Sequence, residues 1–248
     1  HSTHLQSSFT STAEVEIWRT PKLSATTATL TGNLTPLAVA PTAIHPQKPI
    51  EEVILQRGST RRFQESSISY TDLSTMLRSA TSGVDGDYIK EVGVSLNDIY
   101  LIVNAVDGLS SGTYAFHRST QELELLCEGE FRDDAGHLGL NQALAHDAAV
   151  NVYFMANLDA VTKNLGSRGY RAAQLDASTT AGRLYLAAYS LGLGASGLTF
   201  FDDEVTDFLS PNAAGKSVMF LVLLGVPERK RGVAQRHNSN LFTPDTSR

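Results

Sequence analysis

The clearest helical patterns lie in two neighbouring segments, residues 49–57 and residues 69–80. The first opens with a proline and two glutamates, which favour the first turn of a helix, and Gly58 can supply its left-handed end. In the second, apolar residues recur at i, i+3, i+4 and i+7, at positions Leu73, Met76, Leu77 and Ala80. We therefore expect two successive helices, the second with one apolar face.

The longest apolar helix pattern covers residues 178–194. Serine and threonine stand at its start, apolar residues lie on almost every side, and Gly192 and Gly194 stand at its end. A helix that is apolar nearly all round is buried. This helix should therefore run through the middle of the molecule or of a dimer.

Strand patterns fill most of the remaining chain. Short apolar runs bounded by turn residues predict strands at residues 98–106, 113–117, 122–126, 148–157 and 217–227. Residues 137–147 have the character of a helix. Hairpin-like strands mixed with long helices are typical of an α+β fold and not of a regular doubly wound sheet.

The two ends of the chain differ from its middle in composition. Residues 1–48 are rich in Ser, Thr, Ala and Pro and carry little amphipathic period, which predicts an extended N-terminal arm or linker. The patterned region covers residues 49–231, and a C-terminal tail follows at residues 232–248. The chain starts without methionine and without a signal pattern, so we expect a fragment of a longer polypeptide.

The overall charge is acidic, with a formal net charge of −6 and a pI of about 5.6. This balance argues against a broad surface for nucleic acid or for anionic membranes. Cys127 is the single cysteine, which excludes an internal disulfide and fits a reducing cytoplasm. No apolar run approaches the roughly 20 residues of a membrane span. We thus expect a cytoplasmic protein whose partners include neither nucleic acid nor membrane.

Against this acidic background, arginines cluster in QRGSTRRF, residues 56–63. If the chain continues in extended form after the first helix, alternation places Arg57, Ser59 and Arg61 on one face. Two guanidinium forks and a hydroxyl suit a phosphate monoester, because planar forks bind phosphate oxygens in bidentate fashion. The alternative is that the arginines cap the helix and pair with surface carboxylates.

The sequence lacks the local motifs of several common chemistries. It contains no P-loop and no H-E-x-x-H motif. GLGASG (192–197) follows a helix, whereas a dinucleotide fingerprint follows a strand. The seven histidines are scattered without metal-ligand spacing, and we expect no metal site.

Three stretches, in order along the chain, resemble the nitroreductase superfamily of FMN-dependent oxidoreductases. The first is R-x-S-x-R-x-F at residues 57–63, just after the first core helix. The second, residues 168–205, resembles the YR…L…LAA…LGLG…DD segment of the SagB-type dehydrogenase branch, which includes azoline oxidases. The third is SVMFLVLLGVP at residues 217–227, which is similar to the last core strand of that fold. Together the resemblance covers residues 49–231.

This resemblance implies a nitroreductase-like α+β fold, in which helices flank a mixed, mostly antiparallel sheet. It also implies an extensive dimer, formed through the long buried helix, with FMN at the subunit interface. The partner would be a second copy of the chain or a second nitroreductase-like half. The residues that match the family's flavin contacts, by phosphate binding or at the ring, are Arg57, Ser59, Arg61, Ser196, Gly197, Arg229 and Arg231.

The chain departs from the azoline oxidases at their catalytic Lys-Tyr pair. The corresponding positions are Asn164 and Leu165, an amide and an aliphatic side chain that cannot remove a proton. Lys163 stands one place early and is a weak candidate for a displaced base; the catalytic residue is otherwise unknown. A flavin-flanking Pro-Ser-Ala-Gly loop, expected between Gly83 and Asn97, is shortened or missing.

The sequence therefore favours an FMN-dependent oxidoreductase of nitroreductase or SagB type, which performs two-electron hydride transfer through flavin N5. Its substrate would be a small molecule or a peptide, such as an azoline-like, nitro or quinone compound. The alternative is a catalytically degenerate copy of the fold, which acts as a dimerisation or scaffold partner within a tandem protein. A third hypothesis, an anion-binding module without a redox role, depends on the arginines alone.

Overall fold

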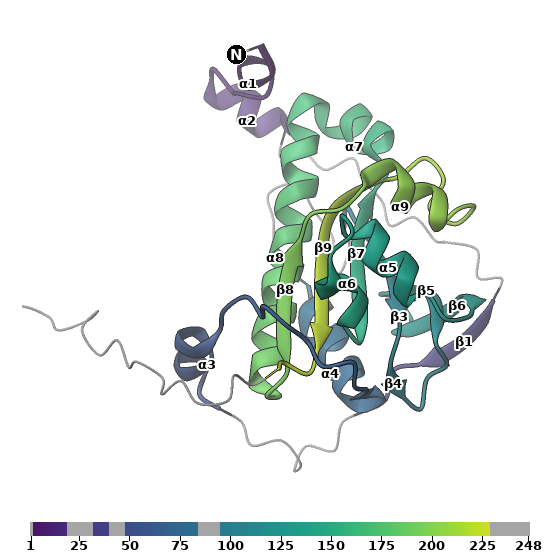
Figure 1. The fold of residues 1–248 in the computed structure, drawn as a ribbon. Helices are drawn as coiled ribbons and strands as arrows, with labels where there is room; N and C mark the ends of the chain where they lie inside the picture. The colour runs from purple at the N-terminus through teal and green to yellow at the C-terminus, as the bar shows by residue number, and fades with distance from the viewer. Residues whose placement is uncertain (1, 19–31, 40–47, 84–94, 229–248) are drawn as a thin grey trace, which may run out of the picture.

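A computed structural model of the protein describes residues 2–18, 32–39, 48–83 and 95–228. Within these ranges, seven strands form a central sheet in the order β1-β6-β5-β3-β7-β9-β8 (Figure 1). All neighbouring strands of this sheet are antiparallel. A separate parallel pair joins β2 (Ile68–Ser69) to β4 (Val106–Asp107). The strands of the central sheet are β1 (Asn33–Pro36), β3 (Asp98–Val103), β5 (Gly112–His117), β6 (Glu122–Glu128), β7 (Val150–Ala156), β8 (Gly194–Leu198) and β9 (Ser217–Gly225).

Helices cover both faces of the sheet, which confirms the predicted α+β fold (Figure 1). On one face, α4 and α8 pack against alternate strand positions such as Leu101. On the other face, α5, α6 and α9 pack against the intervening positions such as Ile102. The helices are α3 (Ile50–Gln56), α4 (Tyr70–Thr81), α5 (Arg132–Leu138), α6 (Ala143–Asp147), α7 (Leu158–Leu165), α8 (Gly169–Ser190) and α9 (Asp202–Phe208).

Both helices predicted before residue 81 are present as α3 and α4. The Ser69 hydroxyl accepts a hydrogen bond from Asp72 N–H at 3.0 Å and so caps the first turn of α4. The end of α3 differs from the prediction. Arg57 has extended backbone angles, φ −61° and ψ 143°, so the chain leaves the helix without a left-handed Gly58.

The long helix α8 is present and largely buried, but it starts at Gly169 and not at Ser178. The sequence prediction treated the serine and threonines of this region as start signals. Inside α8 these hydroxyls bond to the preceding turn instead, as when Thr180 Oγ1 donates to Asp176 O at 3.1 Å. The predicted glycine end is confirmed at Gly192, whose φ is +77°.

Two other predicted elements are interrupted. The predicted helix at residues 137–147 is split into α5 and α6, because Leu140 and Asn141 have positive φ angles of 61° and 55°. The predicted strand at residues 98–106 stops earlier, because Asn104 donates its side-chain amide to Ala148 O at 3.0 Å and the chain then turns into β4. The other four predicted strands are present as β5, β6, β7 and β9.

The N-terminal arm is partly helical and packs on the main body. It contains α1 (Ser2–Gln6) and α2 (Thr12–Trp18), and its strand β1 pairs with β6 at one edge of the sheet. Trp18 Nε1 donates to Leu165 O at 2.9 Å, and the Arg168 guanidinium lies 4.5 Å from the centre of the Phe9 ring. The predicted extended conformation is therefore wrong for the two helical segments.

Several predictions fall outside the described residues. These are the tail at residues 232–248, the basic run at residues 229–231 and most of the segment in which the flavin-flanking loop was expected. The predicted boundaries at residues 48 and 231 stay predictions. None of the described helices combines the length and the apolar character that crossing a bilayer requires.

Candidate functional site

The arginine-containing segment crosses the ends of two neighbouring strands. After α3 the chain runs extended, and Thr60 N donates to Ala195 O of β8 at 2.9 Å. Three residues later, Phe63 forms an isolated bridge with Pro227, just beyond β9. These contacts fix residues 60–63 beside the N-terminal end of β8, at the last strand of the sheet.

Buried anchors and one glycine hold this segment in place. Thr60 and Phe63 are only 7% and 4% exposed. Gly194 makes this approach possible, because a Cβ at that position would collide with Thr60 Oγ1 and lie 3.2 Å from Phe63 Cε1. The residues predicted to share one face are all exposed, and so are Gly58 and Arg62; the predicted set is Arg57, Ser59 and Arg61.

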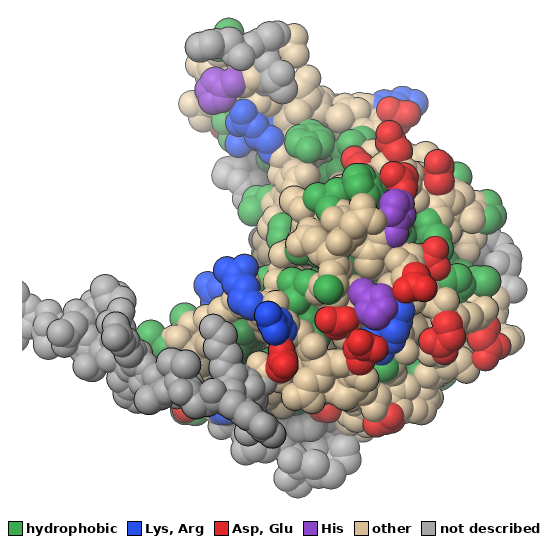
Figure 2. Space-filling model, in the orientation of Figure 1, with side chains coloured by type: hydrophobic (Ala, Val, Ile, Leu, Met, Phe, Trp, Pro, Cys, Tyr) green, Lys and Arg blue, Asp and Glu red, His purple; other side chains and the backbone are tan. Residues whose placement is uncertain are grey.

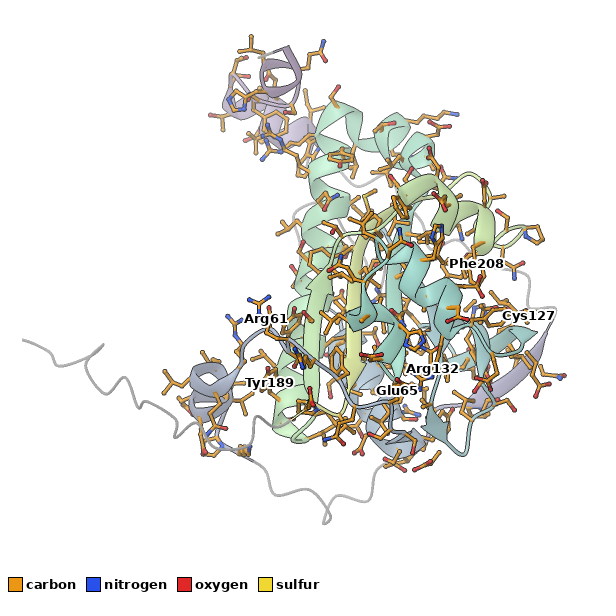
Figure 3. All side chains as sticks on the ribbon, viewed as in Figure 1. Arg61, Glu65, Cys127, Arg132, Tyr189 and Phe208 are labelled. Carbon is orange, nitrogen blue, oxygen red and sulfur yellow. The ribbon has the colours of Figure 1, made fainter. Side chains whose placement is uncertain are left out.

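Two of the arginines have no carboxylate partner within the part of the chain that the structure describes. Arg62 Nη1 lies 3.8 Å from Glu228 Oε2, but Arg57 and Arg61 form no ion pair there. Figure 2 shows basic side chains gathered between α3 and β8, and Figure 3 shows Arg61 on this side of the molecule. The hypothesis of surface ion pairs therefore fits Arg62, whereas Arg57 and Arg61 are exposed and have no carboxylate partner among the described residues.

Two backbone groups of β8, Ala195 O and Gly197 N, point outward from the outer edge of this strand. Ala195 O accepts from Thr60, and Gly197 N donates to Tyr185 Oη, so both groups point away from β9. Ser196 lies between them and is 2% exposed. By alternation, its side chain lies on the face of the sheet opposite to that of Ala195. Of the two predicted ring contacts, Gly197 is thus at the outer edge and the Ser196 side chain is buried.

Two tyrosines of α8 complete this edge, and the sequence analysis did not select them. Tyr185 Oη accepts from Gly197 N–H, and Tyr189 Oη lies 3.4 Å from Thr60 Oγ1. Figure 3 shows Tyr189 and Arg61 on the same side of the molecule, beside β8. Their place depends on how α8 and β8 lie against each other, which no local motif encodes.

The lengths of the two elements do contain a usable signal for Tyr185. This residue stands five positions before the end of α8, which is roughly 8 Å along a helix. Gly197 stands three positions into β8, which is roughly 10 Å along a strand. Because a short turn joins the two elements, the two residues come to nearly the same level.

The weak candidate for a base lies elsewhere in the fold. Lys163 is exposed in the last turn of α7, which Figure 1 shows at the opposite end of α8 from α3. Asn164 donates its side-chain amide to Ala160 O at 2.7 Å, and Leu165 is 3% exposed. The two positions that match the Lys-Tyr pair therefore stabilise α7 and the core.

One group of potential metal ligands was not expected from the sequence. Ligand atoms of Glu65, His146 and Asp147 lie within 4.8 Å of one another. Both imidazole nitrogens of His146 already face carboxylates. Nδ1 lies 2.9 Å from Asp147 Oδ1, and Nε2 lies 3.5 Å from Asp133 Oδ1. Spacing along the chain could not reveal this group, because Glu65 is far in sequence from the adjacent pair His146 and Asp147.

The match to known proteins covers the arginine segment, α8, β8 and β9. The sequence pattern described as "Nitroreductase family" matches residues 54–231. The chain belongs to the nitroreductase family. A candidate nitroreductase from Methanocaldococcus jannaschii is 27% identical to it over 165 residues, which are 64% of this chain and 83% of that protein.

Solved structures of nitroreductases share this fold. A crystal structure of a candidate nitroreductase from Anabaena variabilis matches with a TM-score of 0.70 and 26% identity, over 84% of this chain and 45% of that one. This chain therefore spans less than half the length of the Anabaena protein.

Two matches at lower identity show the fold alone. The Escherichia coli microcin synthetase McbBCD complex with truncated pro-MccB17 bound matches with a TM-score of 0.60 and 13% identity, over 90% of this chain and 84% of that one. A candidate nitroreductase from Desulfovibrio desulfuricans in complex with FMN matches with a TM-score of 0.51 and 16% identity, over 81% of this chain and 99% of that one.

Proposed function

We propose that this nitroreductase-family chain is an FMN-dependent oxidoreductase of the SagB-type branch, with two-electron hydride transfer through flavin N5. FMN, when bound, supplies the electron-carrying chemistry that amino-acid side chains lack. The substrate would be a small molecule or a peptide, such as an azoline-like, nitro or quinone compound. The family match supports the oxidoreductase class, and the likeness in fold to the microcin synthetase complex and to an FMN-bound relative supports the finer assignment.

The observation that carries this proposal is a pair of arginines, next to the outer edge of β8, that have no carboxylate partner among the described residues. Thr60 stands between Arg57 and Arg61 and bonds to Ala195, which lies two residues before Gly197. Two strand residues cover roughly 7 Å. A phosphate group at the arginines and a ring at Gly197 would therefore be separated by a distance that a ribityl chain can bridge.

Each proposed contact follows from the chemistry of its residue. Arg57 and Arg61 would bind phosphate oxygens through their guanidinium forks, and Ser59 would donate one further hydrogen bond. Gly197 permits close approach at the ring, because it has no Cβ. A Cβ at this position would lie 3.3 Å from Phe220 and 3.4 Å from Tyr185. Arg229 and Arg231 stay proposed phosphate contacts, outside the described residues.

We further propose that two nitroreductase-like halves pair across α8, either as a homodimer or as a pseudo-dimer within a tandem protein. Ile54 and Leu55 on α3 and Leu175 on α8 are 49%, 80% and 58% exposed, so these two helices carry large aliphatic side chains that a second half could cover. The length of the Anabaena protein, of which this chain spans 45%, supports the tandem arrangement.

One observation favours a second function, a catalytically degenerate half that serves as a dimerisation or scaffold partner. Asn164 and Leu165 stand where azoline oxidases have their Lys-Tyr pair, and both side chains are used inside the fold. A half without a base could still bind FMN for its partner. Substrate turnover therefore separates the two functions, whereas flavin binding separates both from a plain anion-binding module.

The proposal is tested by titrating FMN into the purified chain and recording the visible absorbance spectrum at equilibrium. We expect flavin bands shifted from those of free FMN. The double variant Arg57→Ala with Arg61→Ala should bind FMN about a hundredfold more weakly, because each lost charge-assisted hydrogen bond is worth about tenfold.

Arg62→Ala is the matched control, since this neighbouring arginine already pairs with Glu228. It should leave the affinity for FMN within about twofold. A folded chain, alone or with its partner half, that binds no FMN would contradict the flavoenzyme assignment. Equal losses in the double variant and in Arg62→Ala would show a general charge effect in place of a phosphate clamp.

A further inference from the structure

Gly197 is proposed to lie at the flavin ring, and its backbone N–H already has a hydrogen-bond partner in this structure. Gly197 N–H donates to the hydroxyl of Tyr185, which stands in the last part of α8. The tyrosine is half-buried and packs against the core on the α8 face of the sheet. A ring that approaches this edge of β8 therefore meets the hydroxyl of Tyr185 at the position of the Gly197 donor.

The hydroxyl hydrogen of Tyr185 has no acceptor among the described residues. A phenolic hydroxyl has one donor position and can also accept. Tyr185 Oη uses an acceptor position for Gly197 N–H, and residues 2–18, 32–39, 48–83 and 95–228 offer no acceptor for its own proton. This donor is fixed in place by the strand edge and by the packing of α8.

We propose that Tyr185 Oη, held by Gly197 N–H, is the hydrogen-bond partner of flavin N5; this inference rests on the proposed function. A backbone N–H can only donate, and it would face the hydrogen that N5 carries in the reduced ring. A hydroxyl can donate to a bare ring nitrogen and accept from the same nitrogen when it is protonated. Tyr185 can therefore keep its hydrogen bond to N5 in both oxidation states.

The neighbouring tyrosine offers a matched control. Tyr189 lies one turn further along α8, and its Oη is 3.4 Å from Thr60 Oγ1 in the arginine segment. It shares the helix, the side-chain type and the same edge of β8, but it lies nearer the proposed phosphate end. Tyr189→Phe should therefore remove a hydroxyl without affecting the contact with N5.

The test compares FMN with 5-deaza-FMN, in which a C–H group replaces N5. Both ligands are titrated into the wild-type chain, Tyr185→Phe and Tyr189→Phe, after circular dichroism has shown that each variant is folded. We expect the wild type and Tyr189→Phe to prefer FMN by about tenfold, the value of one hydrogen bond. Tyr185→Phe should lose this preference, and the ratio between proteins cancels intrinsic differences between the ligands.

Each other outcome overturns the inference in a recognisable way. An unchanged preference in Tyr185→Phe would mean that N5 receives its hydrogen bond from another group. Tighter FMN binding by Tyr185→Phe would mean that the tyrosine caps Gly197 and is displaced by the ring. Loss of FMN binding in every protein, the wild type included, would instead remove the proposed function on which the inference rests.

Discussion

Gly194 allows two distant parts of the chain to approach more closely than a larger residue would permit. A Cβ at this position would collide with Thr60 Oγ1, the anchor of the arginine segment. Gly58 belongs to the same site but has no such role, because the nearest atom to its Cβ position would be Tyr189 Oη, 4.0 Å away. Position 194 therefore requires a glycine, whereas position 58 has room for a larger residue.

We therefore predict opposite outcomes for alanine at these positions. Gly194→Ala should lower the free energy of unfolding by about 1–3 kcal/mol, because Thr60 and Phe63 must move to make room. FMN binding should weaken with it. Gly58→Ala should leave the stability within about 0.5 kcal/mol. Urea unfolding of both variants checks this, and equal midpoints would mean that the segment moves aside without cost.

At the scale of elements, a histidine joins two helices on the face of the sheet opposite α8. His137 of α5 has Nε2 2.6 Å from Glu204 Oε2 of α9 and Nδ1 3.0 Å from Asn141 Oδ1. The hydrogen bonds to Asn141 and to Glu204 raise the pKa of His137 above its usual value. Protonation therefore strengthens the contact between α5 and α9.

The sign of the resulting pH dependence follows from this raised pKa. The contribution of His137 to stability is fully present below the pKa of the unfolded state, and it is lost as the pH rises through the higher pKa of the folded state. We expect the wild type to melt at a higher temperature than His137→Gln at about pH 5.5, with the gap closing toward about pH 8.5. The gap should be small, because both side chains are half exposed.

Thermal unfolding of both proteins across this pH range measures the gap. Glu204→Gln provides an independent check, since it removes the charge that faces the imidazole. Its melting temperature should therefore depend less on pH over this range than that of the wild type. A gap that widens with rising pH would contradict the assignment of the protonated histidine as the stabilising form.

The accuracy of sequence prediction also varies from element to element, for physical reasons. α4 and the strands β5, β7 and β9 follow from periodicity and burial, because α4 has one apolar face and the three strands are mostly buried. The start of α8 and the break between α5 and α6 do not follow from it. The first depends on hydroxyls that bond within the helix, and the second on the left-handed Leu140 and Asn141.

Some features of the candidate site could likewise be predicted from local sequence, whereas others depend on packing. The exposed positions of Arg57, Ser59 and Arg61 could be predicted, because they lie within one short polar segment. The level of Tyr185 beside Gly197 follows from the lengths of α8 and β8, but its contact with the strand edge and the buried orientation of Ser196 depend on how α8, β8 and β9 lie against one another. Local spacing alone does not give this packing.

At the scale of the whole molecule, the exposed apolar residues of α3 and α8 predict a second copy or a second half. If two copies pair as proposed, Leu55→Glu and Leu175→Glu should each shift the chain toward monomer, because a charge would be buried in the contact. Val39→Glu is the matched control, since this residue of the arm is 81% exposed and belongs to neither helix. Sedimentation equilibrium measures the mass of each protein. A monomeric wild-type chain that still binds FMN fully would contradict pairing as a requirement of the site.

The two edges of the central sheet have a consequence for the order in which the protein can form during synthesis. β1 closes one edge against β6, and the segment around Thr60 closes the other against β8. Both closing segments leave the ribosome early, whereas β8 and β9 are among the last described parts of the chain to appear. The arginine segment must therefore wait for most of the polypeptide before its partners exist. A nascent chain interrupted before β8 would carry the proposed phosphate-binding residues but could not assemble the site that they serve.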